Sequence, residues 1–258
     1  MSALGHYLEG EGIATVAIAL IRPQAENTKP PRALWVPFEL GRPFGPPSDA
    51  AFQKRVILAA LRMLERKGGP VVIEDFTDDD PRAKPDPAWR PPRLFRTAGG
   101  GSADALAARL EAEIVQLQAS HRLWLAQHNR TTVGLSGLLI GECGRYVADW
   151  LRGNAPPSPR EGFSAPLILR FAVDDVKAYC LEAAAAGAVK PSSRQLGDWF
   201  WNESATGAAI HALREMLLAS KDERLSVLTM MALPGRHTRA SSAMNAGRSS
   251  MYCTISAL

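Results

Sequence analysis

The sequence predicts an α/β protein, in which a partial doubly wound (Rossmann-like) parallel sheet at the N-terminus precedes an α-helical region. Three observations predict this fold class. Apolar, β-branched runs alternate with a helical segment over residues 1–76, a Pro- and Gly-rich segment occupies 77–102, and helical periodicity extends over 103–232. We therefore expect a partial α/β domain over 1–76, an arm or linker over 77–102 and a helical domain over 103–232. A flexible tail is expected over 233–258.

The elements of the first part follow from local patterns. We expect, in order, a helix over 3–9, a strand over 13–21, a second strand over 33–38, a helix over 50–67 and a third strand over 71–76. The first strand run is nearly all apolar, which is typical of a strand buried on both faces of a parallel sheet. Pro23, Pro30 and Pro31 are expected to exclude regular structure before the second strand. Ser48 or Asp49 can cap the longer helix.

The sequence from residue 77 onward predicts an arm followed by helices. Proline and a glycine triplet exclude regular structure over most of 77–102, but Trp89, Leu94 and Phe95 favour an ordered arm over the sheet rather than a bare linker. Apolar residues at helical spacing then predict helices over 105–127, 131–152, 167–188 and 193–220.

Composition argues against several classes of function. The 258 residues carry a net charge of +4 and a pI near 9.1, but Lys and Arg form no stripe, so no nucleic-acid partner is expected. Cys143, Cys180 and Cys253 form no C-x-x-C pair and no zinc spacing, so neither a metal nor a disulfide framework is expected. No secretory signal and no run long enough to span a membrane is present, which predicts a cytoplasmic protein without a membrane partner. No cofactor is expected in this chain.

A glycine loop is the leading candidate site. Gly41 and Gly45 bracket a turn before a capped helix, so backbone N–H groups there can face an anion. Arg42 within the loop, and Arg32 at the start of the preceding strand, can each hold a carboxylate through two hydrogen bonds. Glu39 completes this expected substrate- or anion-binding set. The alternative is that the glycines only let the chain turn and that Arg32 and Glu39 form a local ion pair.

Signals for a nucleophile are weak. The segment 134–137 places a serine between glycines without the G-x-S-x-G spacing, and we expect it to be helical, with small residues that allow close packing. Cys143 and Cys180 lie in expected helices, where a buried thiol is usually inert. Asp174 and Asp175 are interpreted as charges in the first turns of a helix.

An aromatic cluster is the candidate interface in the helical part. Trp199, Phe200 and Trp201 are consecutive, and consecutive residues of a helix cannot all face one core. The pattern therefore predicts a contact with another helix or another subunit. A buried junction between helices of the same chain is the competing explanation.

One stretch of the sequence resembles a known family. The run LEGEGIATVAIALI, followed by PPRALWVPFELGRPFGPP, resembles the C-terminal part of the substrate-activating component (selenoprotein B or D-proline reductase type) of the glycine, betaine and D-proline reductases. The resemblance covers about residues 4–76, and Ala14 replaces the proline usual in that family. The matching positions are Gly12, Thr15, Pro31, Arg32, Ala33, Gly41, Pro43, Gly45 and Pro47.

The resemblance implies reduction at a carbon–nitrogen bond of an amino acid-like substrate, with a thiol or selenol as the reactive group. That family carries its Cys or selenocysteine just upstream of the first helix, a motif that this sequence lacks. The leading hypothesis is therefore an oxidoreductase subunit that binds a small anionic substrate, while a second chain supplies the N-terminal half of the fold and its Cys or selenocysteine. Two alternatives stay open: a catalytically inactive helical interaction or scaffold protein derived from that family, and a complete small-molecule enzyme with its site in the helical half.

Overall fold

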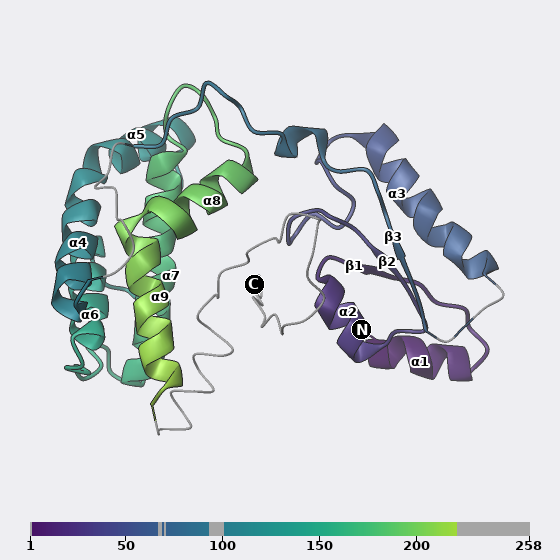
Figure 1. The fold of residues 1–258 in the computed structure, drawn as a ribbon, viewed down its shortest axis with the longest axis horizontal. Coiled ribbons are helices and arrows are strands. Elements are labelled where there is room, and N and C mark those ends of the chain that lie inside the picture. The colour runs from purple at the N-terminus through teal and green to yellow at the C-terminus, as the bar shows by residue number, and fades with distance from the viewer. Residues whose placement is uncertain (1, 67–68, 70, 93–100, 221–258) are drawn as a thin grey trace. The chain divides into compact units, whose positions relative to one another are not determined.

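The computed structural model describes residues 2–66, 69, 71–92 and 101–220. The chain divides into two compact units, Met1–Lys84 (unit 1) and Pro85–Leu258 (unit 2) (Figure 1). Within the described residues, no helix combines the length and the apolar character needed to cross a membrane. The expected tail over 233–258, with Cys253, lies outside the described residues.

Unit 1 contains a small parallel sheet with helices. Its elements are α1 Ser2–Gly10, β1 Ala17–Ala19, α2 Arg22–Thr28, β2 Arg32–Trp35, α3 Ala50–Arg62, a 3₁₀ turn Met63–Glu65, β3 Val72–Asp75 and a 3₁₀ turn Pro81–Ala83. The strands pair in the order β1-β2-β3 and both pairings are parallel, with Ala33 opposite Ala17 on one side and Ile73 on the other. The chain is therefore a mixed α/β protein, and its described residues do not make a complete Rossmann fold.

The core of unit 1 forms where α3 covers one face of this sheet. Alternate residues of a strand point to the same face, so Leu34 and Val36 share the face that packs against α3. Phe38, Phe52 and Phe76 meet there edge to face, with ring centroids 5.5 to 6.0 Å apart. The aromatic cluster fixes α3 on the sheet and positions the loop that precedes the helix.

Two expectations for unit 1 were wrong. The first strand is three residues long and only partly buried, rather than a long strand buried on both faces. The segment after it contains helix α2, with Pro23 in the first helical turn. Proline is tolerated there because the first N–H groups of a helix have no partner inside the helix. The helix ends at Lys29, whose left-handed backbone (φ 46°) leads into the proline pair. The predicted cap of α3 is confirmed at Asp49, whose side chain accepts from the backbone N–H of Phe52 at 3.0 Å.

Unit 2 is a bundle of helices around one apolar core. The helices are α4 Ala103–Gln116, α5 Gln118–His128, α6 Ile140–Leu151, α7 Ala165–Ala184, α8 Ser193–Glu203 and α9 Ala205–Leu218. Helix α4 packs against α6 and α9, and α7 packs against α5 and α6. Apolar residues of these helices, such as Leu110, Ile168 and Leu213, are fully buried between them.

Helix boundaries in unit 2 differ from the expected ones. The predicted helix over 105–127 is two helices that meet at Leu117, and the predicted helix over 193–220 is also two, which meet at Ser204. Residues 131–139 precede α6 without helical structure, so the segment 134–137 is a loop and not a packed helix. Gly134 and Gly137 have φ angles of 133° and 72°, which are incompatible with a right-handed helix.

Part of the predicted arm packs against the helical bundle. Trp89 is buried in the core of unit 2, and the backbone N–H and C=O of Asp86 pair with the side-chain amide of Gln195 at 2.8 Å each. The division between the two units falls within the predicted arm or linker: residues 77–84 belong to unit 1, and residues 85–92 belong to unit 2. Leu94 and Phe95 lie outside the described residues.

Candidate functional site

The glycine loop lies directly after the central strand. Gly41 and Gly45 both have left-handed φ angles, 88° and 85°. The N–H of Arg42 donates to the carbonyl of Glu39 (3.0 Å), and the N–H of Gly45 donates to the carbonyl of Arg42 (2.9 Å). These two N–H groups close turns within the loop and are not available to an anion. The Arg42 side chain is the charged group of the loop that can face an anion.

Gly45 is required by packing as well as by backbone angle. A Cβ at this position would lie 2.6 Å from the ring of Phe52, closer than real Cβ contacts allow. Gly41 has open space around it and needs glycine only for its φ angle. The two glycines thus have different roles, one in the contact with the aromatic cluster and the other in the turn.

Arg32 is held by a carboxylate of the same chain. It forms an ion pair with Glu9 of α1, not with Glu39 as the local alternative proposed. Glu9 also accepts from the backbone N–H and the hydroxyl of Thr15, at 2.9 Å each. The backbone hydrogen bond from Thr15, with the Thr15 hydroxyl and Arg32, holds the pKa of Glu9 below its usual value against the opposing effect of burial. Arg32 therefore connects α1 to the sheet.

Arg42 is placed differently. Its side chain is exposed, and no ion pair joins it to another residue that the structure describes. It follows the carboxyl end of β2, whereas Arg32 stands at the amino end, so the structure does not bring the two arginines together. In open α/β sheets, ligands bind beyond the carboxyl ends of the strands, at the point where the strand order reverses. The described order β1-β2-β3 contains no such reversal, so Arg42 shares only the edge of the sheet with such sites. The N-terminus of α3 is closed to an anion by the Asp49 carboxylate, which leaves Arg42 as the cationic group of this loop.

A second arginine stands at the same edge of the sheet but is paired. Arg22, at the start of α2, forms ion pairs with Asp75 at the end of β3 and, at 3.1 Å, with Glu26. Its guanidinium also lies 5.9 Å from the ring centroid of Trp35. Arg22 therefore links the ends of two strands and is already engaged by two carboxylates.

The two described cysteines are buried thiols. Burial raises the pKa of Cys143 to about 11 and that of Cys180 well above its usual value. Cys143 Sγ lies 3.2 Å from the Ser136 hydroxyl, and Cys180 Sγ lies 3.3 Å from that of Thr206. A thiol reacts as the thiolate, so neither cysteine is suited to act as a nucleophile at neutral pH.

Unit 2 contains buried carboxylates that the sequence analysis did not single out. Glu113 of α4 accepts from the N–H groups of Ala205 (2.9 Å) and Thr206 (2.7 Å), and from the Thr206 hydroxyl (2.5 Å). These N–H groups begin α9 and have no partner inside that helix. Burial raises the pKa of Glu113, which the three hydrogen bonds oppose. Glu113 therefore caps a neighbouring helix from its side.

Asp175 holds the loop before α6. This carboxylate is fully buried and accepts from the N–H groups of Gly134 (2.7 Å), Leu135 (2.9 Å) and Ser136 (2.9 Å), and from the Ser136 hydroxyl (2.5 Å). The expectation of a charge in the first turns of a helix was wrong, because Asp175 lies in the middle of α7. Its neighbour Asp174 forms an ion pair with Arg170, at 3.3 Å.

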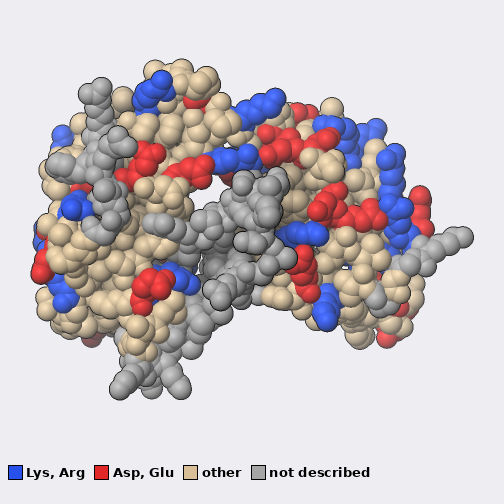
Figure 2. All heavy atoms as spheres, viewed as in Figure 1, with Lys and Arg blue, Asp and Glu red and all other residues tan. Residues whose placement is uncertain are grey.

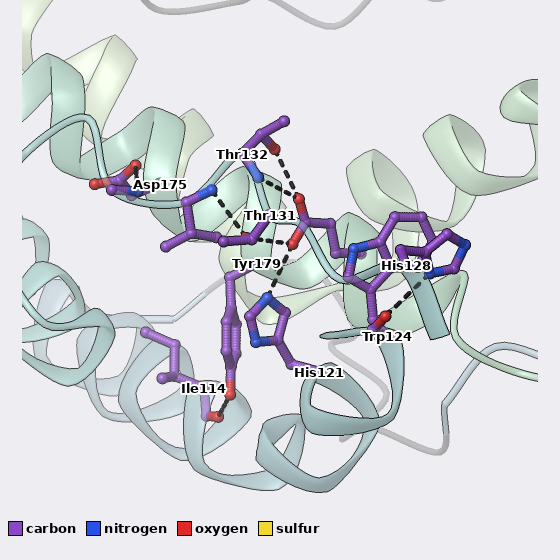
Figure 3. A network of polar contacts seen from close by, with 11 residues as sticks. Ile114, His121, Trp124, His128, Thr131, Thr132, Asp175 and Tyr179 are labelled. Carbon is purple, nitrogen blue, oxygen red and sulfur yellow. Dashed lines mark hydrogen bonds and ion pairs between the residues drawn. The ribbon is translucent and has the colours of Figure 1, made fainter. Parts of the chain in front are cut away.

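Glu182 lies two turns further along α7 and holds the other end of that loop. It accepts from the N–H and hydroxyl of Thr132 (2.7 and 2.8 Å), the hydroxyl of Thr131 (2.7 Å) and the ring of His121 (2.9 Å) (Figure 3). Burial opposes ionisation, but these hydrogen bonds outweigh it and hold the pKa of Glu182 below its usual value. The His121 ring packs on Tyr179, with centroids 4.4 Å apart. Both carboxylate oxygens of Glu182 therefore accept hydrogen bonds from other residues of the same chain.

The predicted aromatic interface is largely internal. Trp199 and Phe200 are buried in the core of unit 2, as the competing explanation of a helix junction required. Trp201 is partly exposed; its ring meets those of Phe200 and His211, and the Lys177 ammonium lies 5.7 Å from its centroid. Of the three aromatic residues, Trp201 is the one with surface left for a partner.

No group of three or more His, Cys, Asp or Glu side chains within the described residues could hold a metal ion. Comparison of the chain with protein-family models, with curated proteins and with solved structures found no match. The candidate site therefore consists of the glycine loop with Arg42.

Proposed function

We propose that the chain is a non-catalytic subunit of a reductase-like complex, which binds a small anionic, amino acid-like substrate while a second chain carries the reactive thiol or selenol. The observation that supports this function best is the position of Arg42, exposed beyond the carboxyl end of the central strand and without an ion pair to any described residue. A substrate carboxylate would accept two parallel hydrogen bonds from its guanidinium.

The chemistry of the two thiols in the described part of the chain supports the division between two chains. The resemblance to the reductase component implies a reactive thiol or selenol, but Cys143 and Cys180 are both buried with raised pKa values. A group that attacks a substrate at Arg42 would have to be ionised and exposed. We assign that group to the partner chain.

Isothermal titration calorimetry on the full chain tests the proposal with glycine, betaine and D-proline as ligands. At least one should bind, and Arg42→Ala should weaken it about tenfold or more, because a charged hydrogen-bonded contact contributes about 1.5–3 kcal/mol. Arg62→Ala is the matched control, since Arg62 is an exposed arginine of α3 that we do not place in the site. Equal affinities of the two variants, or no binding of any of the three ligands, would contradict the proposal.

One observation favours the second candidate, a helical interaction protein without a substrate. The loop over 131–139 is held by Asp175 and Glu182, yet it exposes Leu135 and Leu139 to solvent. A fixed loop with exposed leucines is typical of a contact surface. The calorimetric experiment separates the two candidates, because this one requires no affinity for a small anion.

A further inference from the structure

The outer side of α3 carries apolar side chains that unit 1 leaves exposed. The helix packs its inner residues against the sheet, while Ile57, Leu58 and Leu61 point away from it. Their exposed fractions are 42%, 40% and 49%. An isolated exposed leucine needs no explanation, but three on one side of one helix form a continuous stripe, which we call the outer stripe of α3.

The spacing of this stripe fits a second helix. Lys54, Ile57, Leu58 and Leu61 occupy positions i, i+3, i+4 and i+7, which follow one another along a single face over two turns. This is the arrangement with which a helix packs against another helix or lies in a groove. The outer stripe is therefore suited to an amphipathic helix.

The charges beside the stripe indicate the chemistry of that helix. Arg55 is paired with Asp78, and Arg66 is paired with Glu74 at 2.7 Å. Within the described residues, Lys54 and Arg62 have no ion pair. They are eight residues apart, or about 12 Å along the helix. Figure 2 shows basic and acidic side chains intermixed on the side of unit 1 where Figure 1 draws α3.

This distribution favours a protein helix over an anionic membrane. The basic residues nearest the stripe are partly neutralised by Asp78 and Glu74, so the face lacks the uniform positive charge that attracts acidic lipids. Two separate unpaired cations beside a narrow apolar stripe instead match individual carboxylates on a partner.

We infer that the outer stripe of α3 binds an acidic amphipathic helix of the partner chain. The apolar residues of that helix would lie on Ile57, Leu58 and Leu61, and two carboxylates about 12 Å apart would face Lys54 and Arg62. This inference rests on the proposed function in that it names the surface through which the second chain docks. It does not depend on Arg42.

Fluorescence anisotropy of labelled peptides with the full chain tests the inference. One peptide of about 20 residues has leucines at i, i+3, i+4 and i+7 flanked by glutamates, and the other has lysines in place of the glutamates. We expect the wild-type chain to bind the acidic peptide at least tenfold more tightly than the basic one. The double variant Leu58→Ser/Leu61→Ser should lose this binding at least tenfold, whereas Leu123→Ser, an exposed leucine of α5, should not change it.

A charge reversal gives the sharpest outcome. The double variant Lys54→Glu/Arg62→Glu should reverse the preference and bind the basic peptide, with an unchanged circular dichroism spectrum. Equal binding of both peptides, or of neither, overturns the inference. Two other results also overturn the inference. In one, the chain sediments with phosphatidylglycerol vesicles but binds neither peptide. In the other, the chain forms a dimer that Leu58→Ser/Leu61→Ser abolishes. If the Arg42→Ala result holds while the peptides fail, only the docking surface is wrong.

Discussion

Replacing Asp175 by asparagine removes the charge to which the loop before α6 is attached. The carboxylate has no solvent exposure and receives three backbone N–H groups and one hydroxyl, at 2.5 to 2.9 Å. In Asp175→Asn one oxygen remains, and the new NH₂ group faces backbone N–H donors that it cannot accept from. Each hydrogen bond to a charged group contributes about 1.5–3 kcal/mol, and an unsatisfied buried donor costs about 1–3 kcal/mol.

Since these contributions are not additive, we expect Asp175→Asn to lower the free energy of unfolding by about 3–5 kcal/mol. The matched control is Asp174→Asn, because Asp174 is the adjacent residue with a partly exposed ion pair to Arg170, and it should cost about 1 kcal/mol or less. Urea unfolding followed by tryptophan fluorescence reports mainly on unit 2, which holds five of the six tryptophans. A loss below about 1 kcal/mol, or one equal to that of Asp174→Asn, would refute the role given to Asp175.

Three further predictions concern other contacts. Gly45→Ala should lower the free energy of unfolding by about 3 kcal/mol, because the cost of a left-handed backbone adds to that of a steric clash. Gly41→Ala should cost only about 1–2 kcal/mol, because only the backbone cost applies there. Equal losses of the two variants in urea unfolding would contradict this difference. Glu182→Gln should flatten the acid dependence of stability: the lowered pKa of Glu182 stabilises the fold above about pH 4.5, and this contribution disappears as the pH falls through the folded-state pKa. An unchanged slope between about pH 5 and 3 would count against it. Arg32→Ala should leave the ligand affinity measured by calorimetry unchanged, because the Arg32 guanidinium is paired with Glu9 of α1. A loss of affinity as large as that of Arg42→Ala would show that Arg32 also binds the ligand.

Local patterns were sufficient for much of unit 1. The apolar runs placed all three strands, and the turn chemistry before α3 limited its cap to Ser48 or Asp49, of which Asp49 is the cap. The run of β-branched residues did not determine how much of it pairs, because strand length depends on the neighbouring strand rather than on propensity. Helix α2 was missed because Pro23 was interpreted as a breaker, although proline fits the first turn of a helix.

The polar contacts of unit 2 could not be predicted from periodicity alone. Helical spacing does not show where a helix ends if the end is capped by a side chain distant in sequence, as Glu113 caps α9. One signal was present: Ile168, Asp175 and Glu182 are spaced by seven residues and share a face of α7 with the core. Carboxylates on the buried face of a helix require partners, and the glycine- and threonine-rich segment before α6 could provide them.

The location of ligand binding tests the central claim most directly. Whichever of glycine, betaine or D-proline binds in calorimetry can be titrated into ¹⁵N-labelled chain while amide chemical shifts are followed by NMR. We predict that the largest shifts fall on Glu39, Gly41, Arg42 and Gly45, and that these shifts are absent in Arg42→Ala. Largest shifts in the loop over 131–139, or shifts that persist in Arg42→Ala, would contradict it.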